Sequence, residues 1–252
     1  MSNRKGKRRF TKLIAVLIAA LVVTGVYVGN SVYNDRVEAQ TAADEIDSLK
    51  PTVPDVTDSQ IAVAQTPLPL MDFSSLNAAN PDVIAWIKIP NTIIDDPIAR
   101  GTDNDFYMHH GVNKQYSIYG TVMLDCRVAP DFSDFNNVIY GHNMKNGTRF
   151  GTLIRFKQRS FFDANPTGVL YTPKYTYRLQ IFAVSVIVST SDLFRYNFSS
   201  VDDQKAYIAE LKTKAMFWRD VPISDGKSIV TLTCCSYEFK NARTIVSAVL
   251  AP

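Results

Sequence analysis

A run of 22 residues without a charged side chain, residues 13–34, lies near the N-terminus. Its core, LIAVLIAALVVTGVYVG, consists mainly of Leu, Ile, Val and Ala. Coiled as an α-helix, the run is about 33 Å long, enough to cross the hydrocarbon core of a lipid bilayer. The sequence therefore predicts one membrane-spanning helix that contacts the bilayer through residues 13–34.

The residues before this run are basic. Six of the first twelve side chains are Lys or Arg and none is acidic. By the positive-inside rule, we expect the N-terminus in the cytoplasm and the chain after Asp35 outside the cell, which predicts a single-pass protein of the cell membrane. The alternative is a cleaved signal peptide, but the apolar run is long for one and no small-residue cleavage site follows it directly. We therefore expect residues 1–34 to be a basic tail and an uncleaved transmembrane signal-anchor.

The rest of the chain is slightly acidic. The first twelve residues hold six of the 27 basic side chains, so the remaining 240 residues carry 21 basic against 24 acidic ones. This balance lacks the excess of positive charge that nucleic acid attracts, so no nucleic-acid partner is expected. The composition, 46% hydrophobic and 20% charged, is that of a globular protein and excludes a wholly disordered chain or one with many membrane spans.

Residues 35–70 have the composition of an extracellular stalk. Residues 35–50 are mainly polar and include many residues that favour helix. Residues 51–70 contain four prolines, which argue against a continuous helix or a central strand. From residue 71 the sequence becomes rich in runs typical of β-strands, and we expect one compact domain over residues 71–252. Its β-rich runs, separated in many places by turn residues, are Val83–Ile89, Thr92–Ala99, Thr121–Leu124, Asn137–Tyr140, Gly168–Tyr171, Thr176–Val188, Ser228–Thr233 and Thr244–Leu250.

Eight strands in about 180 residues predict a mainly β fold, a closed or nearly closed barrel. One helix is expected from about Asp202 to Trp218, with Ser200 as its N-cap and Asp203 as the acid three residues later. Its apolar residues Ile208, Leu211, Ala215 and Trp218 form one stripe, which predicts packing on the barrel. A shorter helix is expected around residues 74–79.

Two short segments carry residues suited to catalysis. The strand Val138–Tyr140 is followed by Gly141 and His142, and a second strand runs into Cys234 and Cys235. Arg243 follows eight residues after Cys235, so a hairpin of the last two strands would bring its cation beside that thiol, where it could lower the thiol's pKa or hold an oxyanion. The residues alone leave open a surface His, a core thiol and a surface Arg.

These segments resemble the sortase family, the cysteine transpeptidases of Gram-positive cell surfaces. The run Thr231-Leu232-Thr233-Cys234-Cys235 resembles the family's Thr-Leu-x-Thr-Cys signature, except that its fourth position is Cys234 where the family usually has Thr. The resemblance spans about residues 75–250 and is nearest to class B. Further class B-like segments, in the family's order, are Trp86–Thr92, the groove segment Asn104–Met108, the His loop Tyr140–Phe150 and the helix 202–218 inserted before the nucleophile strand.

The resemblance implies an enzyme that cleaves a C-terminal sorting signal after Thr and joins the protein to a cell-wall amine. Cys235 would be the nucleophile, His142 the general acid and base, and Arg243 the residue that positions substrate or steadies the oxyanion. The implied partners are surface proteins with a sorting pentapeptide and a peptidoglycan precursor amine. The substrate-binding residues expected with these are Asn104, Met108, Ser189, Leu193, Phe194, Thr233 and Ser236, the last through its backbone N–H as a second oxyanion donor.

Other functions remain open, both within the sortase family and outside it. A pilin-polymerising sortase would use a protein lysine as acceptor, a cysteine protease would use water, and a non-catalytic surface-binding module would use neither. Because strand side chains alternate, we expect Cys234 on the opposite face from Cys235. Cys126 is expected to be structural, and His109 and His110 to be loop residues. No Cys-x-x-Cys or His-x-x-x-His spacing occurs, so we expect no metal site and no cofactor.

Overall fold

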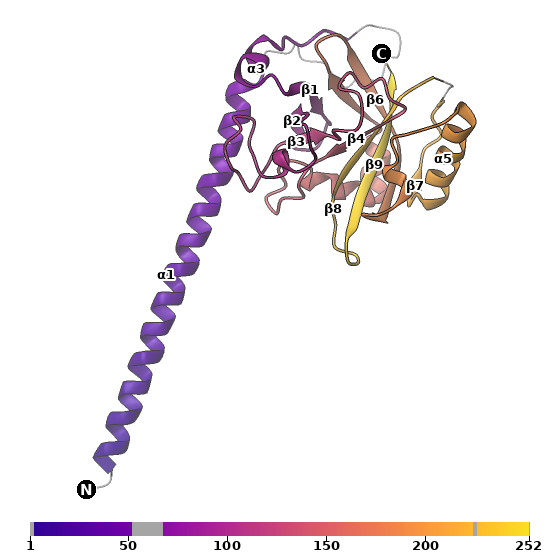
Figure 1. Cartoon of the computed structure of the whole chain (residues 1–252). Coiled ribbons are helices and arrows are strands. Elements are labelled where there is room, and N and C mark those ends of the chain that lie inside the picture. Colours follow the sequence, from indigo (N-terminus) through magenta and orange to yellow (C-terminus); the bar gives the residue numbers. More distant parts are fainter. Residues whose placement is uncertain (1–2, 52–67, 224–225, 252) are drawn as a thin grey trace. The chain divides into compact units, whose positions relative to one another are not determined.

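The computed structural model describes residues 3–51, 68–223 and 226–251 (Figure 1). The chain forms two compact units, residues 1–44 and 45–252. Part of the expected stalk, residues 52–67, lies outside the described residues.

The long helix α1 (Asn3–Leu49) contains the uncharged run and continues through the polar residues after it. The side chains from Lys12 to Val37 are exposed, although most of them up to residue 34 are apolar. A stretch of this length and composition is able to cross a membrane. The continuation past residue 35 agrees with the expectation that the segment after the span begins as a helix.

Eight strands close into a barrel, as the sequence predicts. The strand order around it is β5-β1-β2-β3-β4-β8-β9-β6, and the pairing of β5 with β6 closes the ring. Neighbours are antiparallel except for the parallel pairs β2–β3 and β4–β8. The strands are β1 (Val83–Lys88), β2 (Asp95–Ala99), β3 (Val122–Leu124), β4 (Asn136–Tyr140), β5 (Thr167–Tyr171), β6 (Thr176–Val188), β8 (Ile229–Cys235) and β9 (Ala242–Ala251).

The barrel is filled by apolar side chains that alternate along its strands. Ala85, Ile87, Leu232, Cys234 and Val246 belong to this interior cluster and are almost wholly buried. Because side chains alternate across a strand, the residues between them face outwards, where further elements must cover the apolar ones.

Two layers cover the outside of the barrel. On one side Ile46, from the end of α1, packs with residues around α3 (Ser74–Ala79) against Trp86 and Tyr171. On another side the helix α5 (Val201–Lys214) buries Tyr207 and Leu211 against outward-facing residues of β6, β8 and β9. The chain between β6 and β8 therefore carries an inserted helix, as expected (Figure 1).

The predicted end of the inserted helix at Trp218 is wrong. The helix ends at Lys214, and Phe217–Trp218 form a short strand, β7, paired with β6. Trp218 still packs on the same apolar cluster, but from a strand. The long strand β6 offers an edge that pairs with aromatic residues of high strand propensity, and this tertiary pairing overrides the helical pattern.

Four short helical elements were not predicted. One of them is the α-helix α4 (Arg159–Ala164), and the other three are 3₁₀-helices. These are η1 (Phe106–Met108), η2 (Gly151–Lys157) and η3 (Asp192–Phe194). Two of them, η1 and η3, flank the site described next.

Candidate active site

Cys235 and Arg243 are direct cross-strand partners. Cys235 ends β8, Arg243 lies near the start of β9, and the register of the antiparallel hairpin places them opposite each other. Side chains of such partners share one face of the sheet, with Cβ atoms about 4.5–5.5 Å apart. The hairpin that the sequence predicts therefore brings the guanidinium beside the thiol.

The two adjacent thiols have different surroundings. Cys234 is 2% exposed and packs into the barrel interior, and burial raises the pKa of its thiol to about 12. Both thiols contribute to the lining of a cleft, but Cys235 is only half-buried. Because a thiolate is the reactive form of cysteine, only Cys235 has an environment suited to a nucleophile. The sequence-based expectation that the two lie on opposite faces of the strand agrees with this arrangement.

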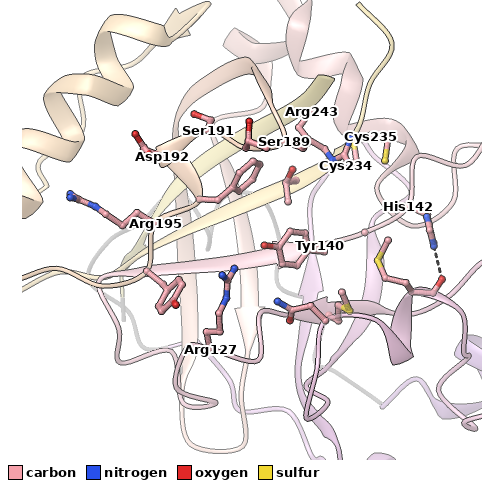
Figure 2. A pocket seen from close by; sticks show the side chains of 18 residues that line it. Arg127, Tyr140, His142, Ser189, Ser191, Asp192, Arg195, Cys234, Cys235 and Arg243 are labelled. Carbon is pink, nitrogen blue, oxygen red and sulfur yellow. Dashed lines mark hydrogen bonds between the residues drawn. The ribbon is translucent and has the colours of Figure 1, made fainter. Parts of the chain in front are cut away.

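His142 follows directly from the neighbouring strand. Tyr140 at the end of β4 pairs with Thr233, and the Gly141 N–H donates to the Thr233 carbonyl at 3.1 Å. The Nε2 atom of His142 lies 2.7 Å from the Met108 carbonyl oxygen (Figure 2). Because a carbonyl only accepts, this contact assigns the proton to Nε2 and leaves Nδ1 as the basic nitrogen of the neutral ring.

Two neighbours of His142 fix the course of its loop. The side-chain amide of Asn143 donates to the Cys235 carbonyl at 2.9 Å, which ties the His loop to the end of the nucleophile strand. A Cβ atom on Gly141 would lie 2.6 Å from the Phe150 ring, so the close approach that requires glycine here is to a side chain. Sequence reasoning did not single out Asn143; its only signal is its place beside His142.

A cleft of about 570 Å³ opens above β4, β8 and η3. Cys235, His142 and Arg243 lie together at one end in Figure 2, while Asp192 and Arg195 lie at the other. Of the expected substrate-binding residues, the cleft is lined by Asn104, Met108, Ser189, Phe194 and Thr233. The site residues thus come from five separate segments of the chain, which the barrel brings together.

Two expected substrate-binding residues do not border this cleft. Leu193 is wholly buried and packs with Tyr207 against the outside of the barrel. The Ser236 backbone N–H donates to the Ala242 carbonyl at 3.0 Å. This N–H is used inside the hairpin in the structure, and the expected role of Ser236 as a second oxyanion donor stays a prediction.

The buried carboxylate of Asp125 holds two cleft-lining residues, Arg127 and Tyr140, in place. Asp125 accepts hydrogen bonds from Arg127 at 2.6 and 2.9 Å and from the Tyr140 hydroxyl at 2.9 Å. Burial disfavours its ionisation, but hydrogen bonds from Arg127, Asn104 and Tyr140 outweigh burial and lower the pKa of Asp125 to about 2. Asn104 also accepts from the Cys126 N–H at 2.8 Å.

Arg127 and Tyr140 line the cleft, yet sequence reasoning did not select either for the site. The Asp125-Cys126-Arg127 run is the local signal for Arg127, and the His loop Tyr140–Phe150 is the local signal for Tyr140. The Arg127 guanidinium lies 4.4 Å from the centre of the Tyr196 ring, and the Tyr140 and Phe194 rings stack with centres 6.4 Å apart. This wall of the cleft is aromatic and cationic, features that depend on tertiary contacts.

The remaining histidines and the third cysteine do not line the cleft. His110 stacks on Phe106 at 4.0 Å and its Nδ1 lies 2.7 Å from the Phe106 carbonyl, while His109 is exposed. Cys126 is a free, half-buried thiol. Over the residues that the structure describes, no cluster of three His, Cys, Asp or Glu side chains could hold a metal ion.

Comparison with known proteins gives one consistent result. No model of a known protein family matches the chain. Sortase B of Listeria monocytogenes is 30% identical over 181 residues, which are 71% of this chain and 74% of that protein. Sortase B of Staphylococcus aureus is 26% identical over 179 residues, 70% of this chain and 73% of that protein.

Solved structures agree with these relatives. The X-ray structure of Clostridium perfringens sortase B aligns with a TM-score of 0.68 at 36% identity, over 72% of this chain and all of that one. A Staphylococcus aureus sortase B–substrate complex aligns with a TM-score of 0.67 at 25% identity, over 71% and 83%. Similarity of this extent in sequence and in fold shows that the chain belongs to the class B sortases and is a cysteine transpeptidase.

Proposed function

We propose that Cys235, His142 and Arg243 carry out the transpeptidation. The observation that carries this proposal is the register of the β8–β9 hairpin, which sets Cys235 opposite Arg243 at the rim of a cleft that His142 also lines. The Asn143 amide on the Cys235 carbonyl supports it, because this contact holds the His loop against the nucleophile strand.

In the first half-reaction, the Cys235 thiolate attacks the carbonyl carbon of a Thr in the substrate. The resulting tetrahedral intermediate collapses to a thioester as the C–N bond breaks, and His142 gives a proton to the departing amine. In the second half-reaction His142 takes a proton from an incoming amine, which attacks the thioester and releases the Cys235 thiolate. One amide bond is broken and one is formed, so no oxidant or cofactor is needed.

Arg243 stabilises the negative oxygen of both intermediates. One of its terminal nitrogens donates to the Ala242 carbonyl at 3.0 Å, and this bond orients the planar guanidinium. Its other N–H groups then bind the oxyanion or the substrate backbone. Since the Ser236 N–H is used within the hairpin, the guanidinium carries a larger share of this stabilisation than a site with two backbone donors would require.

The substrate is a surface protein with a sorting pentapeptide, bound along the cleft. Asn104, Met108, Ser189, Phe194 and Thr233 line it and offer a mixture of apolar and hydrogen-bonding surface. The Thr233 hydroxyl is buried and has no hydrogen-bond partner among the described residues, so substrate can satisfy it. The similarity to a sortase B–substrate complex supports this use of the cleft.

The enzyme acts at the outer face of the cell membrane. Residues 1–34 are the cytoplasmic tail and single span, residues 35–70 the stalk and residues 71–252 the catalytic domain. The basic N-terminus and the exposed apolar helix support this arrangement. The acceptor is a peptidoglycan precursor amine, to which the surface protein becomes anchored.

Mass spectrometry of reaction products tests the proposal. The full-length protein in lipid vesicles is incubated with a library of Thr-containing peptides and several amines, among them a cell-wall peptide and a lysine-bearing protein. We expect cleavage after Thr and transfer to the cell-wall amine. Transfer only to protein lysine would instead identify a pilin polymerase, transfer only to water a protease, and absence of turnover a binding module.

A further inference from the structure

A buried ion pair lies beside the candidate active site and has no part in the reaction described above. Arg149 and Asp96 are each 4% exposed, and their Nη1 and Oδ1 atoms are 3.0 Å apart. Burial raises the pKa of Asp96, and the facing guanidinium opposes that rise. A buried pair does not by itself indicate added stability, because removing two charges from water offsets their attraction. Its position therefore calls for another explanation.

Arg149 belongs to the His loop. It pairs with Asn143 in an isolated β-bridge, and the next residue, Phe150, donates its N–H to the His142 carbonyl at 2.9 Å. Arg149 itself has a backbone φ of +54°, a conformation that residues other than glycine seldom adopt. The backbone of Arg149 is therefore in an unfavourable conformation, and its side chain points into the protein interior.

The Arg149 side chain also holds a second loop. Its Nε atom donates to the carbonyls of Gly120 at 3.0 Å and Tyr119 at 3.3 Å. Gly120, with φ of +52°, lies so close to η1 that a Cβ atom there would meet the carbonyl oxygens of Tyr107 and Met108 at 2.7 Å. The Thr121 N–H donates to the same Tyr107 carbonyl at 2.8 Å. The turn that Arg149 fixes therefore packs directly against the Met108 carbonyl.

These contacts form a closed ring. It runs from the His142 imidazole to the Met108 carbonyl, then to Gly120, to the Arg149 guanidinium and back along the His loop to His142. Asp96, on the barrel strand β2, anchors the guanidinium to the rigid barrel.

We propose that Arg149, oriented by Asp96, is a positioning residue that sets the tautomer and orientation of His142 through the Met108 carbonyl. The proposal rests on the proposed role of His142 in the reaction. A planar guanidinium suits this task because its fork bonds a carboxylate and two carbonyls at once, whereas a lysine ammonium is a single point of charge. Without the fixed carbonyl, the imidazole is free to place its proton on either nitrogen.

The tautomer of His142 is the quantity to measure. The full-length protein, labelled with ¹⁵N-histidine in nanodiscs, contains three histidines, and His142→Gln identifies which signals belong to His142. At a pH where the ring is neutral, we expect the proton on Nε2 in the wild type. We expect Arg149→Lys to show both tautomers and to lose 10- to 100-fold in kcat/KM for peptide cleavage, as for a misplaced catalytic group.

Arg219→Lys is the matched control. Arg219 likewise donates through its guanidinium to two backbone carbonyls, those of Ile181 and Phe162, but on β6 and α4 rather than beside His142. We expect this variant to keep the wild-type tautomer and rate. An unchanged tautomer in Arg149→Lys, or an equal change in Arg219→Lys, overturns the proposal.

A second pair of variants perturbs the same circle of contacts at Gly120 instead of Arg149. Gly120→Ala places a methyl group against the Met108 carbonyl and should shift the tautomer as Arg149→Lys does. Gly226 also has a positive φ, +82°, but no described atom lies within 4 Å of a Cβ there, so Gly226→Ala controls for backbone strain. If Arg149→Lys melts below the assay temperature, the Gly120 pair decides. Normal turnover by His142→Gln would refute the proposed function while leaving the tautomer comparison valid.

Discussion

At the scale of single residues, the candidate site depends on which face of a strand a side chain occupies. Cys234 and Cys235 are neighbours in sequence and both contribute to the cleft lining, yet Cys234 packs into the barrel interior whereas Cys235 is only half-buried. The same alternation places Thr244 opposite Cys234 and Arg243 opposite Cys235. A shift of one residue in this register would place the thiol and the guanidinium on opposite faces of the sheet.

Replacing Arg243 tests whether charge or shape matters at this position. Arg243→Lys keeps the charge but loses the planar fork, so we expect kcat/KM for peptide cleavage to fall by the order of 10²-fold, as for the loss of one oxyanion donor. Arg243→Ala should lose at least as much. Arg159→Lys, at an exposed ion pair on α4, should change nothing. Near-wild-type turnover in Arg243→Ala would remove Arg243 from the site.

At the scale of elements, the barrel ends bring together loops that are far apart in sequence. The connection after β3 carries Asp125, which accepts hydrogen bonds from Arg127 and from Tyr140 at the end of β4. The cleft wall therefore depends on one buried carboxylate remaining ionised.

This dependence predicts an acid-sensitive contribution to stability. The pKa of Asp125 is about 2 in the folded chain, below the value of about 3.9 in an unfolded one. The ionised group therefore stabilises the fold fully above about pH 4, by roughly 2 kcal/mol, and this contribution is lost as the pH falls from about 4 towards 2.

Denaturant unfolding at several pH values measures this contribution. We expect Asp125→Asn to reduce the free energy of unfolding at pH 7 by about 2 kcal/mol relative to the wild type, with the difference shrinking as the pH falls below about 4. Asp163→Asn, at an exposed i,i+4 pair on α4, should cost little at any pH. A difference that stays constant with pH would contradict the account.

How far the sequence predicts these features depends on whether the signal is local. Strand alternation and the eight-residue spacing from Cys235 to Arg243 are local, and they correctly predict the hairpin and the two faces of β8. The N-cap at Ser200 is local too, and its hydroxyl accepts from the Asp203 N–H at 3.1 Å.

The features that sequence reasoning missed arise from tertiary contacts. Which acceptor the Ser236 N–H bonds to depends on how β8 and β9 are joined, and the end of α5 depends on the free edge of β6. Asn143 bonds to the Cys235 carbonyl and Arg149 to the Gly120 carbonyl, while Arg127 contacts the Tyr196 ring. These partners are far away in sequence, and only the folded barrel brings them near. Hydrophobic periodicity carries no signal for such contacts.

At the scale of the whole molecule, we expect the apolar part of α1 and the catalytic unit to have separate roles. The last residues of α1 belong to the catalytic unit, because Ile46 is buried in its outer cluster. Lys50, directly after the helix, forms an ion pair with Asp95 at 2.5 Å. The part of α1 that could span a membrane contributes none of the cleft-lining residues.

Truncation separates these roles. A chain of residues 35–252 should be soluble and cleave peptide with the kcat/KM of the full-length protein, because it keeps the cleft and Ile46. A chain of residues 51–252 should melt at a lower temperature, since it loses the buried Ile46 side chain. Loss of activity in residues 35–252 with the melting temperature unchanged would show that the span takes part in the chemistry.

The most direct test of the central claim is to locate the acyl group during turnover. The full-length protein is mixed with peptide, quenched in acid and digested, and mass spectrometry identifies which of its three cysteines carries the thioester. The account predicts the acyl group on Cys235 in the wild type and in Cys234→Thr, which should keep substantial activity. It predicts neither adduct nor turnover in Cys235→Ala. An adduct on Cys234, or turnover by Cys235→Ala, would contradict it.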